Sequence, residues 1–203
     1  MTRKHPKIKL SGISGLSDAR YAAAAGIDYL GFCFDPVHPR YIPPVKAKEI
    51  SGWTTGSQLV GEFGEQDSEE IESIIEVLEL DLIEINSSLS VDQVNDFSTP
   101  VILKIDLSGY NNSGLKLKID AIHNYCHAIH IYADAPHYID EGTLKHICRK
   151  TNVIWGLPFS EPRTIMETYA PYAFNITAKP EEKTGLADFG DLELLLDKIR
   201  DTD

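Results

Sequence analysis

Residues 7–34 read KIKLSGISGLSDARYAAAAGIDYLGFCF, and this stretch contains the pattern that decides the fold. A short apolar run (7–12) ends in a Ser-Gly turn. An alanine-rich helical pattern (17–26) follows, beginning with a serine suited to capping it and ending on glycine. A second apolar run (29–34) comes next, and both runs are typical of buried parallel strands. The stretch therefore predicts a strand, a helix and a second strand.

The same alternation continues to the end of the chain. Six further runs are rich in Ile, Val, Leu, Phe or Tyr: 58–63, 81–86, 101–106, 128–133, 152–157 and 172–177. Helical patterns lie between most of them, at 68–80 (with Ser68 as the expected cap), 90–97, 140–150, 160–170 and 191–201, whereas 111–126 shows one short helix only. This count predicts a single compact (β/α)8 TIM barrel of the α/β class, forming one domain over residues 1–203. An open doubly wound sheet also fits the alternation, but the first strand–helix turn lacks G-x-G-x-x-G.

Composition and charge limit the function classes. Hydrophobic residues make up 42% of the chain and charged residues 25%, which is typical of a globular protein, and no run of eighteen apolar residues predicts a membrane span. The net charge of −12 argues against nucleic-acid binding. The three cysteines are widely spaced and form no CxxC pair, which favours a reduced, cytoplasmic protein. We expect a monomer or homodimer that acts on a small molecule.

Several motifs carry a family resemblance. Residues 7–50 contain KLSGIS, SDA, GIDYLGFCF and HPRY, while 58–63 read QLVGEF and 156–177 read GLPFSEPRTIMETYAPYAFNIT. These stretches resemble the K-I-C-G-I-T, D-A, G-A-D-x-L-G-F-x-F, S-P-R-Y, V-G-V-F, G-L-N-P-E-N-V and D-V-S-S motifs of the phosphoribosylanthranilate isomerases. The resemblance is loose from 80 to 150. It implies a barrel of tryptophan biosynthesis that converts an aminoaldose phosphate to an aminoketose, an Amadori rearrangement, without a cofactor.

The resemblance also implies the catalytic groups. In the family, the cysteine of K-I-C-G-I is the general base, and this chain has Ser11 there, followed by Gly12. A thiol with a pKa of about 8.5 is partly ionised near neutrality, but a hydroxyl is a weak base. We therefore expect that Ser11 does not perform the family's proton transfer unaided. The alternative is a turn residue whose hydroxyl bonds the backbone.

The family's general acid is an aspartate at the end of strand six. In this chain either Tyr132 or Asp134 occupies that position, and both share strand parity with His130. Asp134 is the candidate acid if the strand extends that far.

We expect ligand contacts at Gly12 and at further positions that follow from the same resemblance. Arg40 of HPRY matches the arginine near the anthranilate carboxylate, or else it anchors its own loop on Asp35 or Asp18. The family's phosphate loops correspond to a region with fewer glycines here. The candidate phosphate-binding residues are Gly156, Thr177 and Lys179, with the helix start at Ser160, and Gly185 and Asp188 match a later G-x-K-D motif.

Strand parity gives a further prediction from the residues themselves. One inward face would collect Lys9, Glu84, Lys104, Asp106, His130 and Asp134. Buried charges must be paired, so this set forms either a structural plug (Lys9–Glu84 and Lys104–Asp106) or a rebuilt site. In the rebuilt site Glu84, Asp106 or His130 would be the base and Asp134 the acid. His130 and Asp134 alone make a poor metal site, so we expect no metal.

Three functions remain open at this point. The chain is a diverged isomerase relative that binds a small carboxylated or phosphorylated metabolite with weak or altered chemistry, an authentic phosphoribosylanthranilate isomerase with a replacement base, or a catalytically silent binding or scaffold barrel.

Overall fold

Eight parallel strands form a closed barrel in the computed structural model, in the order β1 to β8, and β8 pairs back to β1. The structure describes residues 5–86, 88, 90–179 and 189–201. The strands are β1 (Lys7–Ser11), β2 (Tyr29–Cys33), β3 (Gln58–Glu62), β4 (Leu82–Asn86), β5 (Val101–Asp106), β6 (Ala128–Tyr132), β7 (Val153–Trp155) and β8 (Ala173–Thr177). The predicted (β/α)8 barrel is confirmed.

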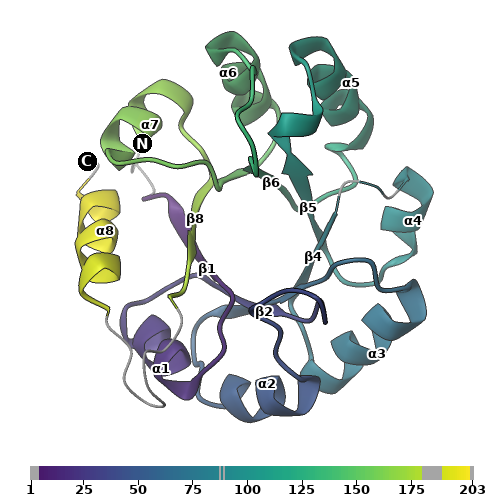
Figure 1. Ribbon diagram of the computed structural model, residues 1–203, viewed down its shortest axis with the longest axis vertical. Helices are drawn as coiled ribbons and strands as arrows, with labels where there is room; N and C mark the ends of the chain where they lie inside the picture. Colours follow the sequence, from purple (N-terminus) through teal and green to yellow (C-terminus); the bar gives the residue numbers. More distant parts are fainter. Residues whose placement is uncertain (1–4, 87, 89, 180–188, 202–203) are drawn as a thin grey trace.

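Helices surround the barrel, as Figure 1 shows in a view along its axis. They are α1 (Leu16–Ala24), α2 (Pro44–Ser51), α3 (Ser68–Leu78), α4 (Val91–Asp96), α5 (Asn112–Ile122), α6 (Glu141–Lys150), α7 (Pro162–Tyr169) and α8 (Gly190–Arg200). Their buried faces pack against the outward-facing strand residues in one continuous hydrophobic core. No helix in the described part of the chain is both long and apolar enough to cross a bilayer.

Helix starts differ from the sequence prediction in three places, and one of them is α7, which begins at Pro162 after Glu161 and not at Ser160. The first helix begins at Leu16, before the expected cap, and no side chain caps it. Asp67 rather than Ser68 caps α3, because its side chain accepts a hydrogen bond from the backbone N–H of Glu70.

The segment 111–126 holds an eleven-residue helix, α5, which follows a 3₁₀ turn η1 (Leu107–Gly109). The Asn111 side chain caps this helix, and Leu115, Ile119 and Ile122 are buried along one face. Tertiary burial of that apolar stripe extends a helix that the sequence pattern indicates only weakly.

The barrel interior is built in two layers, because alternate residues of each strand point inward. The apolar layer is a separate buried cluster that consists of Tyr29, Val60, Leu82, Ile102, Ala128, Ile154 and Ala173. Two residues further along the strands, toward their carboxyl ends, comes the polar layer: Lys9, Glu62, Glu84, Lys104, His130 and Asn175. The apolar layer thus lies directly beneath the polar side chains.

Candidate functional site

A cavity of about 90 Å³ lies at the carboxyl ends of the strands, directly above the polar layer. This is the end of the barrel at which TIM-barrel enzymes place their active sites. The cavity is lined by Ser11, Gly12, His38, Arg40, Glu62, Glu84, Lys104, His130, Asn175 and Thr177.

Lys9 is the centre of the polar layer and is completely buried. Its Nζ lies 2.5 Å from Glu62 Oε1 and 2.9 Å from Glu84 Oε2. Burial lowers the pKa of Lys9, but the carboxylates of Glu62 and Glu84 outweigh that effect, and the net pKa lies above its ordinary value. The ammonium is therefore charged at neutral pH and fixes both carboxylates.

The Ser11 hydroxyl is engaged on both sides. Lys9 Nζ donates a hydrogen bond to Ser11 Oγ at 2.6 Å, and Ser11 Oγ donates to Asn175 Oδ1 at 2.6 Å. These partners are side chains, not the backbone expected for a turn residue. Because an ammonium already occupies an acceptor site of the oxygen and a carbonyl holds its proton, Ser11 is poorly suited to take a proton from a ligand.

Glu84 connects Lys9 to His130. Its Oε2 lies 2.9 Å from His130 Nδ1. Burial alone raises the pKa of Glu84, but Lys9 and His130 more than offset it and hold that pKa well below its ordinary value. The predicted Lys9–Glu84 pair is present.

Lys104 and Asp106, the other predicted pair, go to different partners. Lys104 Nζ lies over the Tyr132 ring, 4.6 Å from its centroid. Asp106 accepts hydrogen bonds from the backbone N–H of Ser108 at 2.9 Å and from its hydroxyl at 2.5 Å. Burial raises the pKa of Asp106, but these bonds outweigh it and lower the pKa overall. Asp106 acts as the cap of η1 in this arrangement.

The two candidates for the acid position lie at the end of β6, outside the set of residues that lines the cavity. Tyr132 is half-buried, and burial raises its pKa to about 12, so its hydroxyl stays protonated. Asp134 is exposed, and its backbone N–H donates to Asp106 Oδ1 at 3.4 Å. The strand ends at Tyr132, so strand parity no longer determines where Asp134 points.

Glu62 is a member of the site that the sequence analysis missed. Its Oε2 accepts a hydrogen bond from the backbone N–H of Gly12 at 3.3 Å, in addition to the Lys9 contact. A Cβ at Gly31 on the neighbouring strand would lie only 2.1 Å from Glu62 Oε1, so a glycine is required there. The signal was available: Glu62 shares parity with Val60, and it replaces the second valine of the V-G-V-F motif.

Gly156 has a comparable role beside His130. A Cβ at Gly156 would lie 2.4 Å from His130 Nε2, so the imidazole packs against this glycine at a distance that no other residue type allows. His130 Nε2 itself is buried and has no hydrogen-bond partner.

Arg40 links the loops that follow β1 and β8. Its guanidinium donates to the backbone carbonyl of Gly12 at 3.5 Å and to that of Ala178. Asp35 and Asp18, the alternative anchors, accept backbone N–H groups of their own loops instead. The arginine is therefore held at the rim of the cavity by carbonyl oxygens.

The candidate phosphate-binding residues come from the ends of two neighbouring strands: Gly156 follows β7, Thr177 is the last residue of β8, and Lys179 lies just beyond it. Thr177 lines the cavity at the end of β8. Lys179 is exposed and forms an ion pair with Asp191 of α8. Gly185 and Asp188 lie outside the described residues.

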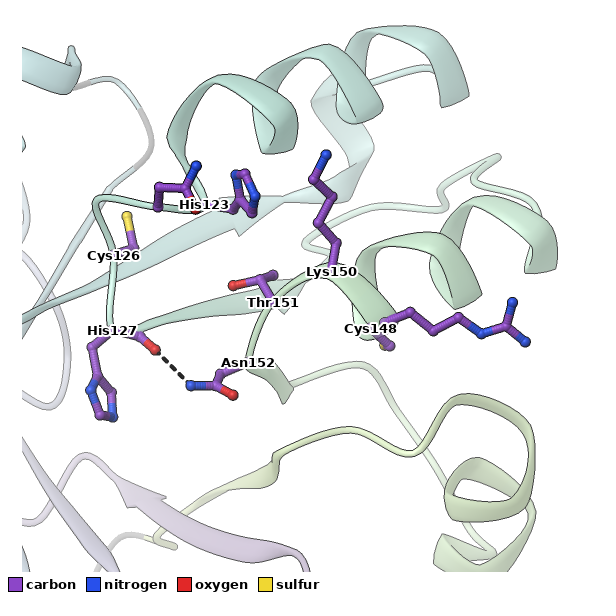
Figure 2. Close-up of a pocket in the computed structure, with 9 residues that line it drawn as sticks. His123, Cys126, His127, Cys148, Lys150, Thr151 and Asn152 are labelled. Carbon is purple, nitrogen blue, oxygen red and sulfur yellow. Dashed lines mark hydrogen bonds between the residues drawn. The ribbon is translucent and has the colours of Figure 1, made fainter.

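A second hollow, of about 420 Å³, lies at the opposite end of the barrel (Figure 2). It is formed where α5 leads into β6 and α6 into β7, and Asn152 Nδ2 donates to the His127 carbonyl at 3.0 Å there. Burial raises the pKa of Cys126 to about 11 and that of Cys148 to about 12, so both thiols are neutral. Among the described residues, no three His, Cys, Asp or Glu side chains are grouped to hold a metal. The mouth cavity is therefore the stronger candidate.

Comparison with known proteins gives one consistent family. The sequence model of N-(5'-phosphoribosyl)anthranilate (PRA) isomerase matches residues 8–125. The N-(5'-phosphoribosyl)anthranilate isomerase of Syntrophus aciditrophicus is 34% identical over 99 residues, which cover 48% of this chain and 43% of that protein. In that alignment the chain therefore spans less than half the length of its relative. The enzyme of Sulfurihydrogenibium sp. is 24% identical over 207 residues, covering 95% and 98%.

Solved structures of the same enzyme share the fold. A phosphoribosyl anthranilate isomerase in complex with reduced 1-(o-carboxyphenylamino)-1-deoxyribulose 5-phosphate superposes with a TM-score of 0.81 at 18% identity, covering 96% of this chain and 98% of that one. The enzyme from Thermus thermophilus has a TM-score of 0.77 at 23% identity, covering 97% and 100%. Monomers generated from the dimeric enzyme of Thermotoga maritima have a TM-score of 0.76 at 20% identity, covering 96% and 95%. At these identities the likeness supports the barrel, not the chemistry.

Proposed function

The chain belongs to the N-(5'-phosphoribosyl)anthranilate isomerase family, and from this premise we propose that it is a diverged member with altered chemistry. It binds a small carboxylated or phosphorylated metabolite at the barrel mouth. The family's aldose–ketose rearrangement is slow in this chain, or its proton transfer runs through a different group.

Arg40 and Lys179 support the binding half of this proposal. The guanidinium is held at the cavity rim, and its remaining N–H groups suit a carboxylate. Lys179 pairs with Asp191 in an exposed position, where an ion pair contributes little stability and exchanges readily for a ligand phosphate. A cavity of about 90 Å³ is far smaller than most ligand pockets, so it accepts the reacting end of a ligand while the remainder lies in the mouth above it.

The observation that carries the altered chemistry is the Ser11 hydroxyl. It stands at the family's base position with Lys9 as its donor and Asn175 as its acceptor. An oxygen held in this way has little basicity toward a C–H bond. The original base is therefore lost while the ligand-binding rim is kept.

The test is the isomerase assay with the aminoaldose phosphate generated in situ, followed by its loss of fluorescence. We expect a rate far below that of a family member with the cysteine, a higher rate in Ser11→Cys, and thermal stabilisation by the reduced deoxyribulose phosphate analogue. A full rate in the unaltered protein contradicts divergence. Absence of both turnover and stabilisation favours the scaffold barrel instead.

A second candidate function is an authentic isomerase with a replacement base. Glu62 favours it, because this carboxylate lines the cavity and its side chain is 14% exposed, against 2% for Glu84. Its contact with Lys9 argues against it, since Glu62 Oε1 already accepts a hydrogen bond from the Lys9 ammonium at 2.5 Å. A full rate that is lost in Glu62→Gln would establish this candidate.

A further inference from the structure

We propose that His130, held by Glu84, is the acid–base group of the mouth cavity, and that Nε2 is the atom that takes and returns the proton. This rests on the proposed function, because it assumes that a ligand of the family's class binds at the mouth.

The orientation of the imidazole follows from Glu84. The Glu84 carboxylate is ionised and fixed by Lys9, so it accepts a hydrogen bond from His130 Nδ1 at 2.9 Å. The neutral imidazole then carries its proton on Nδ1 and its lone pair on Nε2. This is the arrangement in which a carboxylate holds one imidazole nitrogen while the other exchanges protons with a substrate.

Nε2 is the atom left for a ligand. Buried polar atoms nearly always have a hydrogen-bond partner. His130 Nε2 has none, although only 3% of the residue is exposed. Four other side-chain atoms in the described chain share this condition, in His123, His127, Thr143 and Trp155, but those residues do not line the cavity. Gly156 allows the imidazole to lie in this position, because a Cβ there would come within 2.4 Å of Nε2.

The other acid–base candidates in the cavity are occupied. Ser11 is held by Lys9 and Asn175. Glu62 is held by Lys9 and the Gly12 backbone. Glu84 is divided between Lys9 and His130. Two further groups line the cavity: Lys104 lies over the Tyr132 ring, and His38 is exposed and accepts a hydrogen bond from the Arg40 backbone N–H at Nδ1. His130 differs from both because it is buried in the cavity wall and oriented by a carboxylate.

The step is a proton transfer that needs no oxidant or co-reactant. In the protonated imine of an open-chain aminoaldose, the C2–H bond breaks and its proton passes to Nε2. The C–H electron pair forms the C1=C2 bond, and the C1=N pair returns to nitrogen. Nε2–H then protonates C1, and the C2 hydroxyl loses its proton to water, which gives the aminoketose. Glu84 stabilises the imidazolium that exists between the two transfers.

Deuterium exchange tests this step without requiring net turnover. The protein is incubated in D₂O with the aminoketose, 1-(o-carboxyphenylamino)-1-deoxyribulose 5-phosphate, and loss of the C1 proton signals is followed by NMR. We expect exchange with the unaltered protein and a rate lower by roughly 10²- to 10⁴-fold in His130→Gln, the range typical of general acid–base groups. His127→Gln is the matched control, because His127 immediately precedes β6 at the opposite end of the barrel and should leave the exchange rate unchanged.

The outcomes separate this inference from the function it rests on. Thermal stabilisation by the reduced analogue without any exchange overturns the role of His130 but leaves ligand binding intact. Exchange that persists in His130→Gln also overturns it. Neither stabilisation nor exchange overturns the inference together with the proposed function.

A spectroscopic measurement covers the case in which His130→Gln does not fold. The ¹⁵N NMR signals of His130 should show the Nδ1–H tautomer of the neutral ring in the unaltered protein, and Glu84→Gln should weaken this preference. A neutral ring that carries its proton on Nε2 in the unaltered protein would contradict the proposal. Glu84 is a positioning residue here, and the tautomer is the readout that a purely structural role would not change.

Discussion

The apolar layer and the polar layer of the barrel interior are built by the same strands, two residues apart, and they follow different physical rules. In the apolar layer Val60, Leu82 and Ile154 are buried and gain free energy simply by leaving water. In the polar layer the next inward residues on two of those strands are Glu62 and Glu84, whose burial is tolerated because Lys9 lies between them. Burial of the apolar layer stabilises the barrel, whereas burial of the polar layer costs desolvation free energy and calls for a separate explanation.

That explanation is not stability. A buried ion pair seldom contributes more than a well-packed hydrophobic substitute, because desolvation consumes most of the attraction. The apolar layer shows that these strands readily supply such substitutes at the neighbouring inward positions. The polar layer lies beneath a cavity at the carboxyl ends of the strands, which is where TIM-barrel enzymes place ligand chemistry, and this agrees with the proposed function.

The largest expected effect is that of breaking the charge balance of the polar layer. Lys9→Met leaves the Glu62 and Glu84 carboxylates facing each other without their cation, and removing one partner of a buried pair costs about 3–5 kcal/mol. Urea unfolding at neutral pH measures the loss. Adding Glu84→Gln to Lys9→Met should restore part of the lost free energy of unfolding. A loss below about 1 kcal/mol in Lys9→Met would show that the ion pairs of Lys9 do not organise the polar layer.

A somewhat smaller loss is expected in the apolar layer. Leu82→Ala removes a fully buried side chain and leaves a cavity, which costs about 2–5 kcal/mol. The same variant should keep its affinity for the reduced analogue at a temperature where it is folded, because Leu82 lies below the site. A fall in affinity equal to that of a polar-layer variant would mean that the two layers are not functionally separate.

The sequence predicted the difference between the layers in part. Alternation of apolar runs with helices was enough for the barrel, and strand parity brought Lys9, Glu84 and His130 to one inward face. Parity works because a strand alternates rigidly, and it fails where the strand stops, as it does before Asp134.

Two other features were not predicted, and only one of them lies beyond strand patterns. Glu62 shares its parity with the inward-facing Val60, so alternation along β3 was enough to place it in the polar layer. The partners of Lys104 and Asp106 depend on side-chain conformations and on the η1 turn, which no periodicity encodes. The catalytic roles of Ser11, Glu84, Asp106, His130 and Asp134, and the binding roles of Gly12, Gly156 and Thr177, stay predictions.

Lowering the pH should destabilise the protein through the polar layer, and this effect should be smaller than those of the two preceding substitutions. The pKa of Glu84 is below its ordinary value of 4.5 in the folded protein, so this carboxylate contributes stability above that pH that is lost as the pH falls below it. The free energy of unfolding should decline less steeply in Glu84→Gln than in the unaltered protein between about pH 5 and pH 3. Asp120→Asn is the control, since Asp120 also has a lowered pKa but pairs with Lys150 at the exposed surface, where its effect is screened. Parallel pH profiles for the unaltered protein and Glu84→Gln would contradict the argument.

Substitutions of Lys179 and Asp191 should have the smallest effect on stability. They test whether Lys179 binds the ligand phosphate at the cavity rim. Lys179→Ala and Asp191→Asn remove the same exposed ion pair, so each should leave the free energy of unfolding almost unchanged. Their effects on ligand affinity should differ, because only Lys179→Ala removes the cation. A charge-assisted hydrogen bond to a phosphate contributes about 1.5–3 kcal/mol, which corresponds to a Kd for the reduced analogue raised by roughly ten-fold or more in Lys179→Ala alone. Calorimetric titration of the two variants measures this. Equal affinities would place the phosphate elsewhere and would leave Arg40 as the remaining cationic contact for the ligand at the rim.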